Sequence, residues 1–205
     1  MTPEDRVRAL PIWTGPVTVV PLGGGITNTN FVATDAVKKT VVRIGDDIPL
    51  HQILRFNELA ASRAAHQAGV SPAVLHNEPG ILVIDHIDGR TLSAADLQQD
   101  DMLDQALTLI LRTHQVIPQF LRGPVQMFWP FHVIRDYVAT LRDGASEHEP
   151  LLPALLDEAA ILQLAVGPID LVFGHNDLLP ANFLHDGERL WLIDWDYAGF
   201  NSPLF

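Results

Sequence analysis

The sequence predicts an α+β fold in two lobes, the first an antiparallel sheet with one helix and the second mainly helical. Short β-branched runs, separated by turns that contain glycine and proline, occupy residues 17–84. Amphipathic helical patterns take over from residue 93, and strand-like runs return only near the C-terminal end. A polar connector at 85–92 divides the two regions. We therefore expect an N-lobe of residues 1–87 and a C-lobe of residues 88–205.

Three consecutive strands are expected at the start of the N-lobe. A short leading helix within residues 1–16 precedes them, and the strands cover residues 17–22, 28–33 and 40–44. Their connections are tight, so the sequence predicts an antiparallel meander.

One helix and a hairpin complete the N-lobe. Residues 50–68 carry apolar side chains on one stripe at helical spacing, and Gly69 is the expected residue just after the helix end. The segments 73–75 and 81–84 flank a turn that contains Pro and Gly, and they predict a hairpin.

Three helices are expected in the C-lobe. The first follows Ser93, which can cap its first turn, and it ends near residue 116. The second covers residues 130–142 and the third covers residues 153–165, each with a proline at or near its start.

A short hairpin is expected after the helices. The apolar runs 171–173 and 190–193 read as strands, linked by a turn at 185–188. This hairpin would carry the polar residues discussed below and would complete the order of a bilobal fold.

The composition excludes several classes of protein. The chain has no cysteine, so disulfides and thiolate chemistry are excluded. A net charge of −12 disfavours nonspecific nucleic-acid binding and is compatible with a cationic small substrate. The apolar runs are short and broken, and the N-terminus lacks an apolar signal region, so we expect no membrane insertion and a cytoplasmic location. The oligomeric state stays open.

Polar side chains follow both apolar runs of the expected hairpin. Asp177 comes four residues after the first run, with Asn182 five residues further on, and the second run ends in Asp194 and then Asp196. Two acidic strand ends and one Asn suit Mg²⁺, which takes oxygen ligands and keeps phosphates and water. Asp177 would then be free to accept a proton from a substrate hydroxyl. A carboxylate base beside a magnesium site is typical of enzymes that transfer phosphoryl groups.

This stretch resembles the catalytic core of a known superfamily. The pattern His-x-Asp-x-x-x-x-Asn, followed by Ile-Asp-Trp, is similar to that of aminoglycoside phosphotransferases and choline kinases, which share the protein-kinase fold. The residues of the two motifs, His175-Asn-Asp-Leu and Asp194-Trp-Asp-Tyr197, are most similar to those of the choline/ethanolamine kinase branch. The resemblance implies a protein-kinase-like fold with ATP and Mg²⁺ as cofactors. It makes Asp177 the catalytic base and assigns the metal to Asn182 and Asp194. Similar family sequences continue beyond the point where this chain stops, so we expect a C-terminally truncated C-lobe.

A glycine-rich loop between the first two strands is the expected phosphate-binding element. Glycines let backbone N–H groups approach a phosphate, although an ordinary flexible hairpin turn has the same composition. The loop also resembles the Gly-Gly-x-Ser/Thr-Asn loop of choline kinases. Its candidate ATP-binding residues are Gly23, Gly24, Gly25, Ile26, Thr27 and Asn28.

Two further N-lobe features are expected to bind ATP. Arg43 lies in the middle of a strand, and a cation there needs a partner, for which Glu58 on the following helix is the candidate. In protein kinases a strand lysine pairs with a helix glutamate, and choline kinases commonly carry arginine at the matching position. The connector residues Asp85, His86 and Ile87 would read the adenine edge with backbone groups; a plain connector is the alternative.

The acceptor substrate is expected to be a small cationic alcohol. Asp177, Asp196 and Tyr197 are the candidate substrate residues, because an acid and an aromatic face both favour a quaternary ammonium group. Packing at the start of a loop is the alternative for Tyr197, and His175 is expected to hold the loop structurally. The substrate ranking is choline, ethanolamine, thiamine and then aminoglycosides, and a catalytically inactive nucleotide-binding fragment remains a further alternative.

Overall fold

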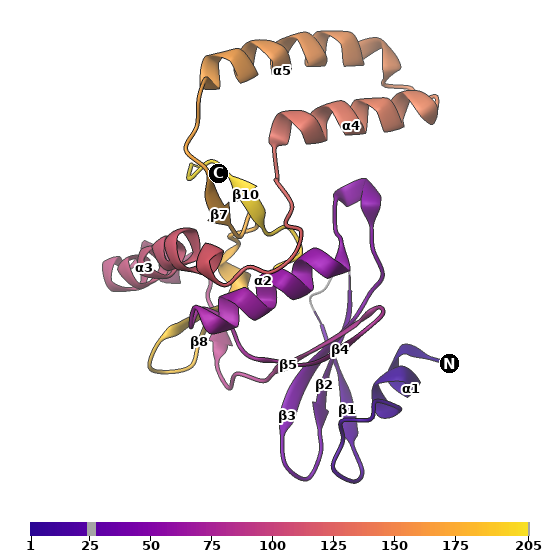
Figure 1. Ribbon diagram of the computed structural model, residues 1–205, viewed down its shortest axis with the longest axis vertical. Helices are drawn as coiled ribbons and strands as arrows, with labels where there is room; N and C mark the ends of the chain where they lie inside the picture. The colour runs from indigo at the N-terminus through magenta and orange to yellow at the C-terminus, as the bar shows by residue number, and fades with distance from the viewer. Residues whose placement is uncertain (24–27, 205) are drawn as a thin grey trace.

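The computed structural model describes residues 1–23 and 28–204 (Figure 1). A five-stranded sheet with helix α2 across it forms the N-terminal region, and helices α3, α4 and α5 belong to the C-terminal region. The α+β fold class expected from the sequence is confirmed, because an antiparallel sheet with one helix precedes a region whose main elements are helices.

The N-terminal sheet is antiparallel, with strand order β1-β2-β3-β5-β4. Its first three strands form the predicted meander, and the last two form the predicted hairpin. Their bounds are Thr18–Leu22 (β1), Thr29–Thr34 (β2), Lys39–Ile44 (β3), Val74–Glu78 (β4) and Ile81–Asp85 (β5).

The two faces of β3 have different surroundings. Val42 and Ile44 point into an apolar cluster that is covered by α1 (Pro3–Arg8), whose Val7 is fully buried. Side chains alternate along a strand, so Arg43 points to the opposite face, where α2 (Arg55–Gln67) lies. This alternation aims Arg43 at Glu58.

Helix α2 joins the two regions. Its buried apolar residues are alanines, and the apolar cluster that includes them also contains Phe173 and Trp195 of the C-terminal region. At its end the N–H of Val70 donates to the carbonyl of Ala65, and that of Gly69 donates to His66. This is a Schellman motif, and the φ of Gly69, +71°, confirms the predicted helix end.

The last two C-terminal helices match the predicted ones closely, and the first matches at its end. They are α3 (Asp100–Val116), α4 (Pro130–Asp143) and α5 (Leu152–Val166). Short 3₁₀ turns lie between the main elements: η1 (Pro49–His51), η2 (Asp96–Gln98), η3 (Ile117–Gln119), η4 (Glu149–Leu151) and η5 (Pro180–Asn182). No helix in the described part of the chain is long and apolar enough to cross a membrane.

The leading helix α1 lies within the predicted range, and two other predicted helices are shorter than expected. Helix α2 begins only at Arg55, because a bridge between Ile48 and Ile53 occupies the segment before it. Ser93 exchanges hydrogen bonds with Asp96 at the start of the separate turn η2, so α3 starts later than predicted.

The predicted pairing of the last hairpin is wrong. Strand β8 (Phe183–His185), not the run at 171–173, pairs with β9 (Leu190–Leu192), and β6 (Arg90–Thr91) pairs with β8. The 171–173 run becomes β7 (Val172–Gly174) and pairs with β10 (Gly199–Asn201). The turn before residue 190 was placed correctly. Strands of three residues that contain glycine carry too weak a local signal to reveal their partners.

Candidate active site

The loop after β7 is held in place by a buried histidine. His175 is 1% exposed, its Nε2 donates to the Ile193 carbonyl at 2.8 Å, and its Nδ1 accepts from the Asp177 N–H at 3.3 Å. Both bonds require the neutral ring, and burial lowers the pKa of His175. His175 therefore has the structural role that the sequence suggested, and it ties the start of the loop to the end of β9.

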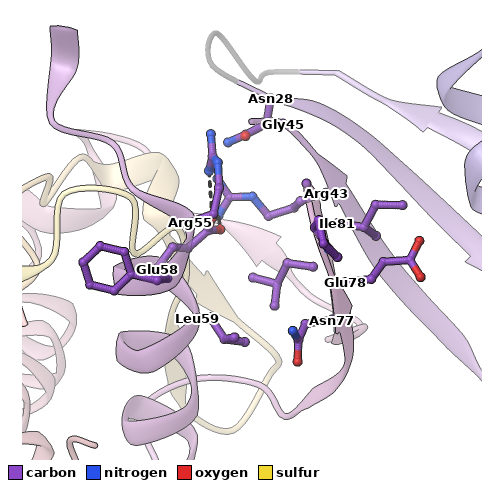
Figure 2. Close-up of a pocket in the computed structure, with 13 residues that line it drawn as sticks. Asn28, Arg43, Gly45, Arg55, Glu58, Leu59, Asn77, Glu78 and Ile81 are labelled. Atoms are coloured by element: carbon purple, nitrogen blue, oxygen red, sulfur yellow. Dashed lines mark hydrogen bonds and ion pairs between the residues drawn. The ribbon is translucent and has the colours of Figure 1, made fainter. Parts of the chain in front are cut away.

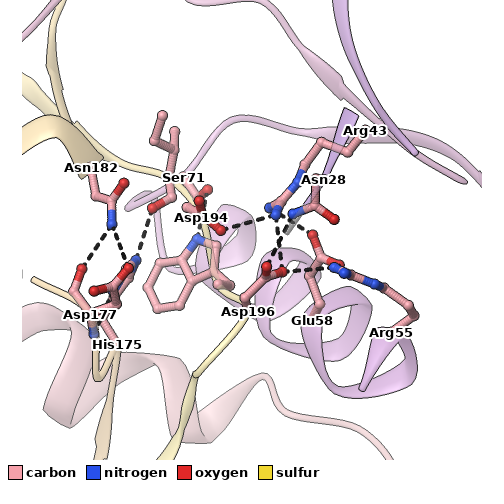
Figure 3. A network of polar contacts seen from close by, with 12 residues as sticks. Asn28, Arg43, Arg55, Glu58, Ser71, His175, Asp177, Asn182, Asp194 and Asp196 are labelled. Atoms are coloured by element: carbon pink, nitrogen blue, oxygen red, sulfur yellow. Dashed lines mark hydrogen bonds and ion pairs between the residues drawn. The ribbon is translucent and has the colours of Figure 1, made fainter. Parts of the chain in front are cut away.

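Asp177 and Asn182 face each other across that loop (Figure 3). The Asn182 side-chain nitrogen donates to the Asp177 carbonyl at 2.8 Å and to Asp177 Oδ2 at 3.2 Å. Both partners are acceptors, so the amide nitrogen must point toward Asp177. The Asn182 Oδ1 is then the atom left to act as an oxygen ligand.

Two residues beside the site adopt left-handed backbone conformations. Asn176 has a φ of +63° and Asp194 a φ of +71°. Asn and Asp tolerate this region best among residues with a side chain, and such conformations concentrate at functional sites. Asn176 also donates to the carbonyls of Tyr197 at 2.9 Å and Gly199 at 3.3 Å. These bonds hold the loop against the chain that follows Asp194.

Arg43 is the centre of an ion-pair network that joins the two regions. Its Nη1 lies 2.7 Å from Glu58 Oε1, and its Nη2 lies 3.0 Å from Asp194 Oδ1 and 3.0 Å from Asp196 Oδ1. The predicted Arg43–Glu58 partnership is present in the structure. Burial alone would lower the pKa of Arg43, but Glu58 and the two aspartates hold it above its usual value.

Arg55 closes the network into a ring, and sequence reasoning missed it. Its Nη1 lies 2.7 Å from Glu58 Oε2 and 2.9 Å from Asp196 Oδ1 (Figure 3). The side chains of Glu58 and Asp196 are only 2% and 5% exposed. Each of these buried carboxylates contacts the guanidinium groups of both Arg43 and Arg55. The one available signal was the spacing of three residues between Arg55 and Glu58 on a helix.

The carboxylates of the site outnumber its cations. Asp177, Asp194, Asp196 and Glu58 face two guanidinium groups, which leaves a net charge of −2 when all are ionised. Asp194 is the most accessible of the three acids that bind Arg43, with 40% of its side chain exposed. Such an excess of negative charge suits a divalent cation or a cationic ligand.

Only part of the predicted phosphate loop can be located. Gly24, Gly25, Ile26 and Thr27 lie outside the described residues. Gly23 follows the end of β1 and is exposed, whereas the Asn28 side chain donates to Asp196 Oδ2 at 3.1 Å. Asn28 therefore connects this loop to the ion-pair ring.

The predicted adenine-binding segment begins at the end of β5. The Asp85 N–H donates to the Ala73 carbonyl at 2.8 Å, and the His86 N–H donates to the Lys39 carbonyl at 3.3 Å. Both N–H groups are already used within the sheet. The N–H of Ile87 donates to no residue in the described part of the chain, which makes it the available donor of this segment.

Asp196 does not fit the substrate role expected for it. Its carboxylate bonds Arg43, Arg55 and Asn28, and with 5% of the side chain exposed it has little surface to offer a ligand. Its position makes it an internal anchor, because a buried charge persists only where it is paired.

Tyr197 lies beside the site with its ring half-buried. It packs edge-on against Phe128, which precedes α4, with ring centroids 6.2 Å apart. Burial raises the pKa of Tyr197, and Asp196 adds to that rise. The side chain of Asn57 fixes this neighbourhood, since it donates to the Ala198 carbonyl at 2.7 Å and accepts from the Gln126 N–H at 3.1 Å. Phe128 and Asn57 were not singled out by the sequence.

A cavity of about 260 Å³ lies on the other side of the ring (Figure 2). Its walls come from the first part of α2 and from the turn between β4 and β5, and they include Phe56, Leu59 and Ile81. Asp177, Asn182 and Asp194 are not among its lining residues. The cavity is therefore separate from the carboxylates that would perform phosphoryl transfer.

Solved structures that superimpose on this chain include phosphotransferases with a protein-kinase-like fold. A choline/ethanolamine kinase family protein from Mesorhizobium loti superimposes with a TM-score of 0.69 at 30% identity, covering 98% of this chain and 67% of that chain. The choline kinase LicA from Streptococcus pneumoniae gives a TM-score of 0.71 at 25% identity, covering 91% and 66%. LicA has also been solved in complex with AMP.

Sequence comparison leads to the same group. Protein LicA of Haemophilus influenzae is 30% identical over 189 residues, which cover 89% of this chain and 54% of the relative. The model of the phosphotransferase enzyme family matches residues 18–205. The chain therefore belongs to the phosphotransferase enzyme family, in its choline/ethanolamine kinase branch. It spans between 49% and 68% of the length of the curated relatives it matches.

Proposed function

We propose that the protein is an ATP- and Mg²⁺-dependent kinase that phosphorylates the hydroxyl of an amino alcohol, with choline or ethanolamine as the acceptor. The observation that carries this proposal is the catalytic loop itself. His175 fixes its start, Asn182 reaches back to Asp177 at 3.2 Å, and Asp194 lies at the neighbouring strand end. These groups suit a reaction in which positioning and charge stabilisation do most of the work.

Asp177 would act as the base. Its carboxylate is half-buried, and the contact with the Asn182 amide holds one oxygen in a fixed direction. An acceptor hydroxyl bonded to the other oxygen would be oriented toward the γ-phosphate. It would pass its proton to Asp177 as its oxygen bonds to the γ-phosphorus and the bond from that phosphorus to the bridging oxygen breaks, with ADP leaving.

Arg43 and the glycine-rich loop would hold the nucleotide phosphates. Arg43 points from the sheet toward the catalytic carboxylates, and Asn28 joins the loop to the same ring. The free N–H of Ile87 would meet the adenine edge. Because ATP is the proposed phosphoryl donor, a cytoplasmic location is part of the same proposal.

The donor set beside Asp177 fits Mg²⁺. No three His, Cys, Asp or Glu side chains gather as a metal site in the described ranges 1–23 and 28–204. Mg²⁺ does not need such a cage, because it binds through one or two carboxylates together with phosphate and water. Asn182 Oδ1 and the exposed carboxylate of Asp194 would hold it. A bound ion would neutralise charge on the transferring phosphoryl group.

The acceptor preference rests on charge, aromatic surface and relatives. The site carries a net negative charge, and Tyr197 and Phe128 offer aromatic surface beside it. Both features favour a quaternary or primary ammonium group. The solved relatives are a choline kinase and a choline/ethanolamine kinase family protein. Thiamine and aminoglycosides follow in the ranking.

An ATP-consumption assay with choline, ethanolamine, thiamine and an aminoglycoside tests the proposal. The wild-type protein should consume ATP with choline or ethanolamine. Asp177→Asn should abolish turnover and leave ATP binding largely intact, because it removes only the base. Asp157→Asn, the same change at an exposed position on α5, is the matched control and should retain full activity. Near-normal turnover by Asp177→Asn would contradict the mechanism, and ATP binding without transfer to any acceptor would favour the inactive nucleotide-binding alternative.

A further inference from the structure

Arg55 has a place in the ion-pair ring that the catalytic motifs do not explain. Its side chain is 17% exposed, and one nitrogen, Nη1, contacts both Glu58 at 2.7 Å and Asp196 at 2.9 Å. These are the same two buried carboxylates that Arg43 contacts. The ring therefore holds two counter-ions for two carboxylates, and Asp194 is a third acid attached to its outer edge (Figure 3).

Arg43 has little free surface to offer a nucleotide phosphate while it keeps its present contacts, because its side chain is only 10% exposed and its Nε is buried. Its Nη2 is shared between Asp194 and Asp196, each at 3.0 Å, and its Nη1 contacts Glu58. Releasing one carboxylate would free a donor for the phosphate. Asp194 is the one that solvent can receive, because 40% of its side chain is exposed, compared with 5% for Asp196 and 2% for Glu58. When phosphate replaces Asp194 on Arg43, part of the charge of Arg43 is directed at the phosphate. Glu58 and Asp196 then depend more strongly on Arg55 for neutralisation.

We propose that Arg55 is a positioning residue that keeps Glu58 and Asp196 neutralised, so that Arg43 can exchange Asp194 for a nucleotide phosphate. The inference rests on the proposed function, since it requires a nucleotide in the site. Without Arg55, Arg43 would serve both buried carboxylates alone. Removing one member of a buried charge set is strongly unfavourable, so Arg43 would be retained by the carboxylates rather than given to the ligand.

A binding cycle with ADP in the absence of Mg²⁺ tests this role. Calorimetry would give the ADP dissociation constant for wild type, Arg55→Met, Asp194→Asn and the double variant. Leaving out the metal prevents Asp194 from acting as a ligand. Arg55→Met should weaken ADP binding by about tenfold, which corresponds to one hydrogen bond to a charged group. Asp194→Asn should increase the affinity for ADP, because it removes the carboxylate that competes with phosphate for Arg43. In that background Arg55→Met should lose less ADP affinity, because Arg43 no longer has to give up its contact with Asp194.

Two further variants separate positioning from folding. Arg55→Lys keeps the positive charge and should recover most of the lost affinity. Should Arg55→Met fail to fold, the same cycle is run with Arg55→Gln, which removes the charge but can still donate a hydrogen bond. Arg63→Met is the matched control, because Arg63 is an exposed arginine on α2 whose guanidinium bonds only the Asn77 side chain, at 2.7 Å, among the described residues. It should leave ADP affinity unchanged.

The outcomes distinguish this inference from the proposed function. A smaller loss in the Asp194→Asn background supports the positioning role. Equal losses in both backgrounds, or no rescue by lysine, would mean that Arg55 is merely structural; the inference would then be overturned while the kinase proposal stands. A wild-type protein that binds no ADP would overturn both.

Discussion

Removing Arg43 should destabilise the protein in a way that depends on pH. The variant Arg43→Met keeps the length of the side chain and deletes its charge, which leaves Glu58 and Asp196 with Arg55 as their remaining cation in the ring. Breaking a buried pair by removing one partner costs about 3–5 kcal/mol. Arg55 still bonds both carboxylates, so we expect about 3 kcal/mol near neutral pH, the lower end of that range. For a chain of this size that loss lowers Tm by about 6–12 °C.

The pH dependence comes from Glu58. Burial raises the pKa of Glu58 above its usual value of 4.5, and Arg43 is the strongest interaction opposing that rise. When the folded pKa exceeds the unfolded one, the group's stabilisation is fully present below about pH 4.5 and is lost as pH rises through the folded pKa. Deleting Arg43 raises the pKa of Glu58 further. The destabilisation by Arg43→Met should therefore be smaller at acidic pH and larger at neutral pH.

Urea unfolding of the nucleotide-free protein at two pH values measures both effects. The free energy of unfolding is extrapolated to water for wild type, Arg43→Met and the control Arg63→Met. The control should stay within about 0.5 kcal/mol of wild type, because Arg63 is exposed. Adding Glu58→Gln to Arg43→Met should restore part of the stability at neutral pH. An Arg43→Met protein as stable as wild type at both pH values would refute this account of the ring.

Two substitutions test the backbone around the catalytic loop. Gly199→Ala should destabilise the protein by about 1–3 kcal/mol in urea unfolding, because an added Cβ would lie 2.7 Å from the Gln126 carbonyl oxygen; a neutral effect would contradict the close approach. Asn176→Ala should cost about 1–3 kcal/mol, since φ is +63° and two hydrogen bonds are lost. Asn176→Gly keeps access to that conformation and should be less damaging, so equal losses for the two variants would assign the cost to the hydrogen bonds alone.

Much of the fold followed from local patterns. The three strands of the meander, the β4–β5 hairpin and the helices α3 to α5 each carry a period or punctuation that a short window of sequence reveals. Gly69 marked the end of α2 because only a residue that accepts positive φ completes the turn there. The helix starts were less accurate, since a bridge and a separate turn replaced the first residues of two helices.

Local patterns of this kind do not predict which short strands pair with each other. Strand β7 pairs with β10 because Gly199 lets the chain pass close to the Gln126 carbonyl, which belongs to a segment more than seventy residues earlier. A three-residue strand has no periodicity from which to infer a partner. The incorrect hairpin came from pairing the two runs that were most apolar.

What the sequence determined by itself is the set of polar residues on the loop after β7. His175, Asp177 and Asn182 lie within eight residues, so their spacing alone brings them onto one turn, and Asp194 follows the next apolar run. The tertiary structure decided which charges meet. Arg55 and Asp196 are 141 residues apart, and Arg43 and Asp194 are 151 apart. Packing of α2 against both regions buries Asp196 and places Arg55 beside it. A buried carboxylate requires a cation as its partner, and no local sequence pattern specifies which cation that is.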